Sequence, residues 1–235
     1  MHKIHKAQSG NVLWVILMAV VLLGLLTMVL SRSGSQVDQT ANTEQLTIKS
    51  AQILRYAKTL EDAVQKLKLD GISEKALSFQ NTTTATDYTN ANCTTTACRI
   101  FDGGGAGLAY RNFDGANNGE DWIFTGANNV GTTANPVGTT AGGSGNDLVM
   151  LLPNVGSALC IQINREWGIG TAGTLPEDTT GVSTTAFTGT YTAGAAVVLE
   201  GDPAPFELNG KHAGCFTDTA ADPDIVYFYY VILAR

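Results

Sequence analysis

A continuous apolar run lies near the start of the chain. It extends from Val12 to Leu30 and contains 19 residues without a charge. At about 1.5 Å per residue, a helix of this length spans the roughly 30 Å hydrocarbon core of a membrane. Lys3 and Lys6 precede the run, and basic flanks remain cytoplasmic. The pattern predicts a transmembrane helix with its N-terminus inside and the rest of the chain outside, with a cleaved secretory signal as the alternative.

A second helical pattern follows the apolar run. The stretch Val37 to Leu69 contains one apolar position every three or four residues and no Pro or Gly. The repeating positions are Ile53, Ala57, Leu60, Val64 and Leu67. This pattern predicts an amphipathic helix that ends at Asp70-Gly71. The strict spacing lasts only about two heptads, which favours packing against the protein's own sheet over a coiled-coil stalk.

The rest of the chain has the composition of a β-rich domain. Thr favours strands, whereas Asn and Gly favour turns. The last predicted strand is apolar on both faces, as a central strand covered on both sides requires. One helix is also predicted, from Val155 to Trp167, with Asn154 as its N-cap and Gly168 at its end. The predicted strands are Arg99–Phe101, Leu108–Phe113, Trp122–Phe124, Leu148–Leu152, Ala196–Glu200, Cys215–Thr217 and Ile225–Ala234.

The charge of the chain is low and unevenly distributed. Only 15% of the residues are Asp, Glu, Lys or Arg, and the net charge is −7. Residues 1–70 are net positive, whereas residues 71–235 hold 6 basic and 16 acidic residues. A protein that binds nucleic acid needs a cationic face against the phosphates. The acidic balance of the larger part therefore excludes nucleic acid as a partner.

Four cysteines lie beyond the apolar run: Cys93, Cys98, Cys160 and Cys215. An even number in an exported region predicts disulfides rather than free thiols. Of the three pairings that four cysteines allow, we favour Cys93–Cys98 and Cys160–Cys215. A zinc site is the alternative, but it needs clustered ligands, and this region has one histidine and no C-x-x-C motif.

Candidate catalytic chemistry is sparse. A nucleophile normally needs a base beside it, and His212 is the only histidine outside the first ten residues. Cys215 lies three residues away, but a cysteine in a disulfide is not a nucleophile. The glycine run at residues 103–107 lacks the Lys-Ser/Thr of a phosphate-binding loop and predicts a hairpin turn instead. The sequence therefore predicts that the protein is not an enzyme.

Calcium is the cofactor for which the sequence offers candidate ligands. Ca²⁺ takes carboxylate and carbonyl oxygens from flexible loops. One candidate set is Asp218, Asp222 and Asp224, just before the last predicted strand, and a second is the acidic segment 114–121. Solvated acidic turns, without a metal, are the favoured interpretation of both, with calcium binding as the alternative.

The N-terminal segment resembles that of prepilin-like proteins, namely type IV pilins and type II secretion pseudopilins. A short basic leader ends in Gly10 directly against the apolar run, and Gly24 falls where that family often has a helix-loosening glycine. Two positions depart from the family: Asn11 replaces its usual aromatic residue, and Val15 replaces its glutamate. The missing glutamate favours a minor over a major subunit.

The resemblance implies that a prepilin peptidase cuts after Gly10 and leaves Asn11 as the new N-terminus. The implied domains are a leader (1–10), a transmembrane helix with a flexible exit (11–35), an amphipathic stalk helix (36–70) and a β-rich extracytoplasmic domain (71–235). The implied α+β fold is pilin-like: a long transmembrane and amphipathic helix packed on an antiparallel, disulfide-stapled β domain.

The implied function is that of a structural subunit of an extracellular or periplasmic filament. Its core would be built from the N-terminal helix, including Leu13, Leu17, Val21 and Gly24. The partners would be further copies and related pilin-like subunits, after a single-pass location in the inner membrane. An uncleaved signal anchor is the alternative, and it would make the protein a monomeric, membrane-anchored extracytoplasmic binding or adhesion module.

Overall fold

The computed structural model describes residues 11–131, 135–138, 145–170, 173–192, 197–199, 201 and 207–235. It leaves out the side chains of residues 11, 29–41, 197 and 198. The chain divides into two compact units, Met1–Gln45 and Leu46–Arg235.

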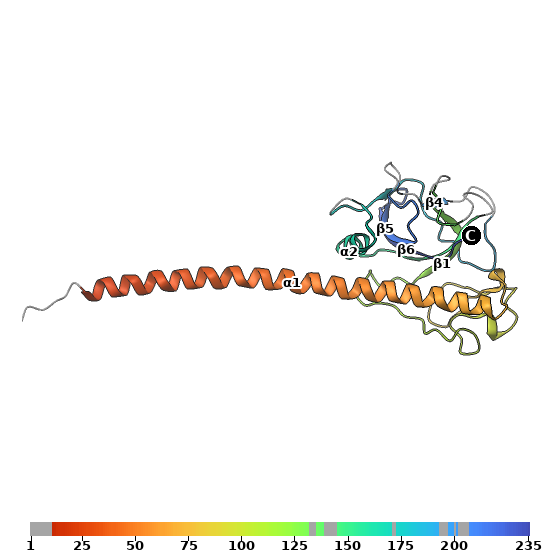
Figure 1. Ribbon diagram of the computed structural model, residues 1–235, viewed down its shortest axis with the longest axis horizontal. Helices are drawn as coiled ribbons and strands as arrows, with labels where there is room; N and C mark the ends of the chain where they lie inside the picture. Colours follow the sequence, from red (N-terminus) through yellow and green to blue (C-terminus); the bar gives the residue numbers. More distant parts are fainter. Residues whose placement is uncertain are drawn as a thin grey trace, which may run out of the picture. The chain divides into compact units, whose positions relative to one another are not determined.

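Helix α1 (Asn11–Leu69) is continuous and contributes to both units (Figure 1). It contains no proline, and it is helical also at residues 31–35, where the sequence predicted a flexible exit. The helix ends where the sequence predicted, because Gly71 has a φ of 89° and the Ile72 amide donates to the Leu67 carbonyl at 3.0 Å. A glycine in the left-handed region is the usual residue just past a helix end.

The predicted transmembrane helix is corrected by the structure. Within the described part of the chain, no helix combines the length and the apolar character that crossing a membrane requires. The predicted fold with a membrane-spanning segment and the predicted inner-membrane location, N-terminus inside, are therefore wrong.

The second unit contains one mixed, mainly antiparallel sheet (Figure 1). The strand order is β3-β5-β6-β2-β1-β4, and the three central pairs, β5 with β6, β6 with β2 and β2 with β1, are antiparallel. The two short outer strands are parallel to their neighbours: β3 pairs with β5, and β4 pairs with β1. The strands are β1 (Ile123–Val130), β2 (Asp147–Leu152), β3 (Glu177–Asp178), β4 (Val197–Leu199), β5 (Ala213–Asp218) and β6 (Ile225–Leu233).

Strand β6 is central and buried on both faces, as its sequence predicted. Phe228, Tyr230 and Ile232 belong to the hydrophobic cluster that α1 covers. The alternate residues Tyr227, Tyr229 and Val231 belong to a second cluster on the opposite face. Alternation along a strand sends successive side chains to opposite faces, so each face of β6 contributes to a different core.

The predicted apolar stripe of the stalk helix packs on this sheet. Its five members, Ile53, Ala57, Leu60, Val64 and Leu67, are each at most 1% exposed. They share one cluster with Trp122, Phe124 and Phe228 of the sheet region. Burying each large aliphatic side chain contributes about 1.5–3 kcal/mol. The preference for packing on the protein's own sheet over a coiled coil is confirmed.

Two predicted strands are absent from the described chain. Residues 99–101 and 108–113 are irregular, and Ser78 and Arg99 form an isolated bridge. The turn between them folds back tightly, because the Ala106 amide donates to the Arg99 carbonyl at 3.1 Å and the Leu108 amide to the Ile100 carbonyl at 3.0 Å. These short local bonds replace a strand ladder. Two single-turn 3₁₀ helices, Glu74–Ala76 and Thr96–Cys98, lie in the same part of the chain.

Helix α2 (Ser157–Trp167) confirms the predicted embedded helix, but its cap differs. The N-cap is Gly156, and Asn154 has a φ of 54°. The Asn154 side-chain amide donates to the Glu120 carboxylate at 3.0 Å instead of capping the helix. Gly168 ends the helix in the left-handed region, as predicted.

Candidate functional site

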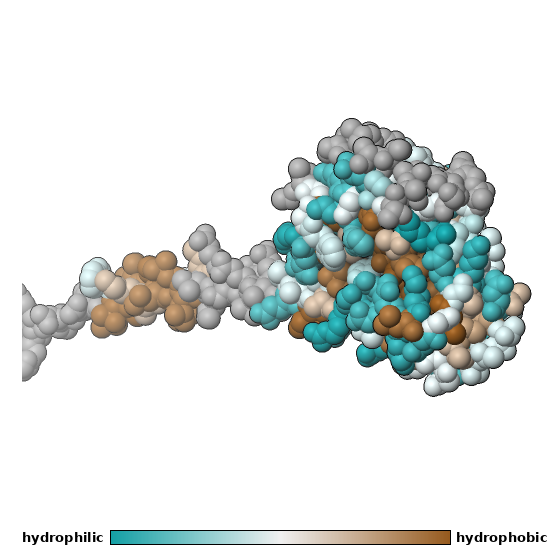
Figure 2. Space-filling model, turned by 45° about the vertical axis from the view of Figure 1, so that its right-hand side comes forward, coloured by the Kyte–Doolittle hydropathy of each residue, from teal (hydrophilic) through white to brown (hydrophobic). Residues whose placement is uncertain are grey.

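The described N-terminal part of α1 presents an exposed apolar surface (Figure 2). Leu13 is 72% exposed, Leu17 59% and Val21 53%. These residues recur every four positions, and Gly24 follows three positions later, so all four share one helix face. A Cβ at Gly24 would have nothing within 4 Å. Within the described part of the chain, the four residues predicted to form a filament core therefore lie together on one exposed helix face.

The same surface carries no unpaired hydroxyl group among its described side chains. Its one hydroxyl, on Thr27, donates to the Gly24 carbonyl at 2.9 Å within the helix. Exposed large apolar side chains follow one another almost without a break from Val12 to Met28. Contiguous apolar surface of this extent marks an interaction site in a folded protein.

The predicted processing site falls at the boundary of the described chain. Gly10 lies outside the described residues, and Asn11 is the first residue of α1, without a described side chain. The structure therefore leaves cleavage after Gly10 a prediction.

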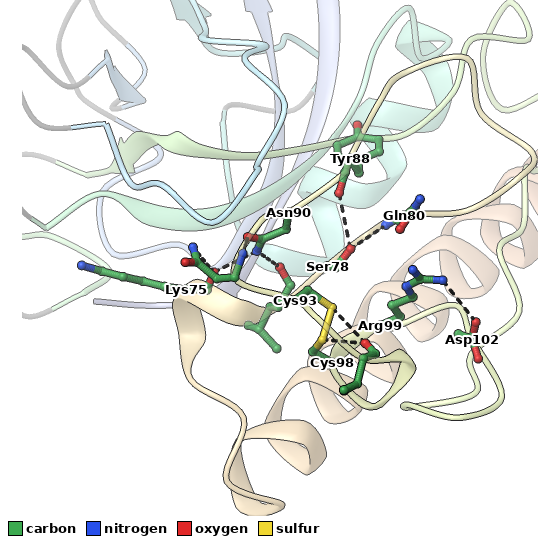
Figure 3. The surroundings of a disulfide bond; sticks show 12 residues. Lys75, Ser78, Gln80, Tyr88, Asn90, Cys93, Cys98, Arg99 and Asp102 are labelled. Atoms are coloured by element: carbon green, nitrogen blue, oxygen red, sulfur yellow. Dashed lines mark hydrogen bonds and ion pairs between the residues drawn. A yellow bond between two sulfur atoms is a disulfide. The ribbon is translucent and has the colours of Figure 1, made fainter.

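The Cys93–Cys98 disulfide closes a small loop that is tied to the start of the globular unit (Figure 3). The buried Asn90 side chain organises this loop, because its amide donates to the carbonyls of Lys75 and Leu77, both at 2.8 Å. The Cys93 amide in turn donates to the Asn90 carbonyl at 2.9 Å. The loop is thus held by one covalent bond and by one buried amide.

A polar cavity of about 440 Å³ lies beside this loop, between residues 80–83, Arg99, Phe101 and Tyr110. Arg99 faces Asp102 at 3.7 Å, and Figure 3 shows the two side chains meeting at one side of the disulfide. Most of the other polar groups serve the fold. Asn81 bonds to three backbone groups, and Tyr110 donates to Asp121 at 3.2 Å and accepts from the Trp122 amide.

The second disulfide joins Cys160 on α2 to Cys215 on β5, and both sulfur-bearing residues are fully buried. The two bonds present are the two pairings that the sequence favoured. The described chain contains no free cysteine. Cys215 is therefore not a free thiol, and it cannot serve as a nucleophile beside His212.

The predicted calcium ligands do not converge. Asp218 is 5% exposed, and its two carboxylate oxygens accept bonds from the amides of Ala220 at 3.0 Å and Val182 at 3.3 Å. Asp222 and Asp224 are exposed. Within the described ranges, no three His, Cys, Asp or Glu side chains lie close enough to hold a metal ion together. Asp218 instead fixes the loop that follows β3.

The acidic segment 114–121 is also bonded internally. Asp121 accepts from Tyr110 and from the Asn112 amide at 3.0 Å, and the Asn117 amide donates to the Glu120 and Pro153 carbonyls. These contacts stabilise the turn itself.

A groove that sequence reasoning missed lies on α1 within the second unit. It has a volume of about 430 Å³, and it is lined by Arg55 of α1 and by Arg111 of the segment 108–113. The Arg111 amide donates to the Tyr56 hydroxyl at 3.3 Å, and this hydrogen bond ties the segment 108–113 to the helix. Burial raises the pKa of Tyr56 to about 12, although the Arg111 amide and charge act in the opposite direction. The full lining is Gln52, Arg55, Tyr56, Thr59, Leu108, Ala109, Arg111 and Phe113.

One indirect signal for this groove was present in the sequence. Arg111 is one of three basic residues between Leu77 and Gly210, so its charge is conspicuous in an acidic region. Its proximity to Arg55 depends on the fold, because the two positions are far apart in the chain.

The chain matches no protein-family model, no curated protein and no solved structure.

Proposed function

We propose that the protein is the subunit of a filament and that it polymerises through the apolar N-terminal part of α1. The observation that carries the proposal is the run of exposed large apolar side chains from Val12 to Met28. Removing such a side chain from water is worth about 1.5–3 kcal/mol. Association costs about 4–15 kcal/mol in lost freedom of motion, so several such side chains per copy are enough to offset it.

The character of the second unit is compatible with close stacking of copies. Its disulfides indicate maturation in an oxidising compartment. Its surface is rich in Thr, Asn and Gly and poor in charge, which limits repulsion between neighbouring subunits. A polar unit on an apolar assembly helix would leave the polar unit on the filament exterior.

The experiment introduces a charge into the assembly surface. We expect Leu17→Asp and Val21→Asp in the full-length protein to abolish sedimentable filaments seen by electron microscopy, because a carboxylate buried between helices is costly. The second unit should stay folded, as judged by near-UV circular dichroism. Thr82→Asp, an exposed change in the second unit, serves as the matched control and should assemble normally.

The N-terminus of the protein from its native source provides an independent test. A chain that starts at Asn11 in intact-mass measurements would support prepilin-type processing. A chain that starts at Met1 and stays monomeric would contradict the filament and leave a binding module as the better description. Normal filaments from both aspartate variants would also refute assembly through this helix.

A further inference from the structure

The groove lined by Arg55 and Arg111 carries two positive charges. In the described part of the structure, neither arginine forms an ion pair. Lys58, one turn along α1 from Arg55, shows the contrast: it pairs with Glu61 at 2.9 Å and with Asp62 at 3.2 Å. Acidic residues exceed basic ones in this chain by 21 to 14, so a shortage of acids does not explain the unpaired arginines.

The segment that brings Arg111 and Phe113 to the groove is held in place by several contacts. The Arg111 amide is bonded to the Tyr56 hydroxyl at 3.3 Å, and the Arg111 carbonyl accepts from the Trp122 indole at 2.9 Å. Phe113 packs edge-on against the Tyr56 ring, with the ring centroids 5.6 Å apart. Because both the amide and the carbonyl of Arg111 are hydrogen-bonded, its Cα has a defined position beside the helix.

The lining of the groove selects an anion. It contains two guanidinium groups and no carboxylate. Arginine presents a planar fork of donors that matches the two oxygens of a carboxylate. The hydroxyl of Tyr56 accepts the bond from Arg111, which leaves its own proton able to donate. An anion with paired oxygens, such as a carboxylate, therefore fits this site.

The chain also carries a complementary pair of carboxylates elsewhere. Asp222 and Asp224 flank Pro223 in the short loop between β5 and β6, and both are exposed. Within the described chain neither has a hydrogen bond or an ion pair. The loop is held in place because β5 and β6 pair as far as Asp218 and Ile225.

We propose that the groove binds the Asp222–Asp224 loop of a second copy of this chain. The inference rests on the proposed filament and names a contact between its globular units. The groove and the loop are different surfaces of the same chain, so the contact is head-to-tail. Such a contact leaves one free groove and one free loop at the ends, and it repeats without closing when its rotation does not form a ring.

The role of this contact is to set register and orientation. Exposed ion pairs are individually weak and are screened by salt. Charged contacts chiefly discriminate between correct and incorrect arrangements of neighbouring molecules. The apolar surface of α1 would drive association, and the groove would determine how successive copies align.

Charge reversal in the full-length protein tests the contact. We compare Arg55→Glu/Arg111→Glu with Asp222→Lys/Asp224→Lys and measure the critical concentration for filament assembly by sedimentation. Each double variant should raise it by about tenfold, because two attractive pairs become repulsive. The control matched to the arginine variant is Lys66→Glu/Lys75→Glu. It makes the same change in net charge at exposed positions and should have little effect on the critical concentration.

Two rescue experiments make the test specific. Combining all four substitutions in one chain should restore the wild-type critical concentration, because the pairs then reform with opposite sign. An equimolar mixture of the two double variants should also assemble, since alternating copies place Glu against Lys and Arg against Asp. Restoration in both cases would support the direct contact.

The outcomes separate this proposal from the filament itself. If the wild-type protein forms no filaments, the proposed function fails first. If the wild type assembles but the groove variant behaves like the control, or the combined variant is not restored, only the groove–loop contact is refuted. A groove variant that assembles normally but loses binding of an acidic oligosaccharide would likewise overturn the proposal, in favour of a different carboxylate ligand.

Discussion

Asn164 on α2 bonds to both backbone groups of Cys215 on β5. Its side-chain amide donates to the Cys215 carbonyl at 2.9 Å, and the Cys215 amide donates to its side-chain oxygen at 2.7 Å. Strand β3 pairs with β5 only at Thr217 and Asp218, so among the described strands none pairs with the outer edge of β5 at Cys215. Asn164 fills that place beside the Cys160–Cys215 disulfide, and together they fasten α2 to the sheet.

Replacing this amide should destabilise the second unit. Asn164 is 2% exposed, so Asn164→Ala leaves two backbone groups of Cys215 without partners in a buried position. We expect a loss of about 2–4 kcal/mol in the free energy of unfolding, measured by urea denaturation of the full-length protein. Asn118→Ala is the exposed control and should stay within about 0.5 kcal/mol of wild type. Equal stability of the two variants would contradict the structural role of Asn164.

The two disulfides should contribute unequally to stability. They close loops of sequence separation 5 and 55. In the loop-entropy description, the long loop gives about 4 kcal/mol and the short one about 2 kcal/mol. The Cys160→Ala/Cys215→Ala variant should therefore unfold at a lower urea concentration than Cys93→Ala/Cys98→Ala. The reverse order would show that the entropy of the unfolded chain does not dominate.

The sequence predicted well those elements whose burial follows a local period. The helical stripe around Leu60 and the two-faced strand that became β6 are examples, because the spacing of their apolar side chains reflects the core directly. The predictions of strands at residues 99–101 and 108–113 were wrong. Their backbone groups bond within a tight turn, a choice that side-chain pattern does not encode. The transmembrane assignment was also wrong, because no helix in the described part of the chain combines the required length and apolar character.

Hydrogen bonds between distant segments escaped prediction, although the Cys160–Cys215 disulfide did not. The bond from the Arg111 amide to Tyr56 and the bonds from Asn164 to Cys215 each join residues more than 50 positions apart. Asp218 illustrates the same limit for the candidate site. It was a candidate calcium ligand together with Asp222 and Asp224, and its carboxylate accepts bonds from the backbone amides of Val182 and Ala220. Composition identifies a carboxylate, whereas only the fold shows what that carboxylate contacts.

Alkaline pH should destabilise the protein through its tyrosines. Burial raises the pKa of all seven: Tyr56, Tyr88, Tyr110, Tyr191, Tyr227, Tyr229 and Tyr230. Tyrosines in the unfolded chain have a pKa of about 10 and lose their protons first. Above that pH the unfolded state binds fewer protons than the folded state, so the free energy of unfolding falls as pH rises. Below pH about 10 this contribution is fully present.

Absorbance at 295 nm, which reports tyrosinate, provides the measurement. The native protein should titrate above pH 10, with Tyr56 near its pKa of about 12, whereas the protein in concentrated urea should titrate near 10. Urea midpoints at pH 9, 10 and 11 should then fall in that order. Native and unfolded titration curves that coincide would refute the proposed burial of these hydroxyl groups.

The turn at residues 103–107 offers a final prediction, because two of its glycines have opposite surroundings. A methyl group at Gly105 would overlap the Arg99 carbonyl oxygen and lie 2.7 Å from the Thr96 carbonyl oxygen. At Gly103 a methyl group would have nothing within 4 Å. Neither glycine has a positive φ, so the contrast between them is purely one of space.

We therefore expect Gly105→Ala to cost about 1–3 kcal/mol, as overpacking does in a closely packed site. The hydrogen bond from the Ala106 amide to the Arg99 carbonyl has to lengthen to make room, and this hydrogen bond folds the turn back on residue 99. Gly103→Ala is the matched control. It should leave stability unchanged or raise it by about 0.4–1 kcal/mol, since alanine reduces the freedom of the unfolded chain. Urea midpoints that move in the same direction and by the same amount would show that the close approach at Gly105 does not hold the turn.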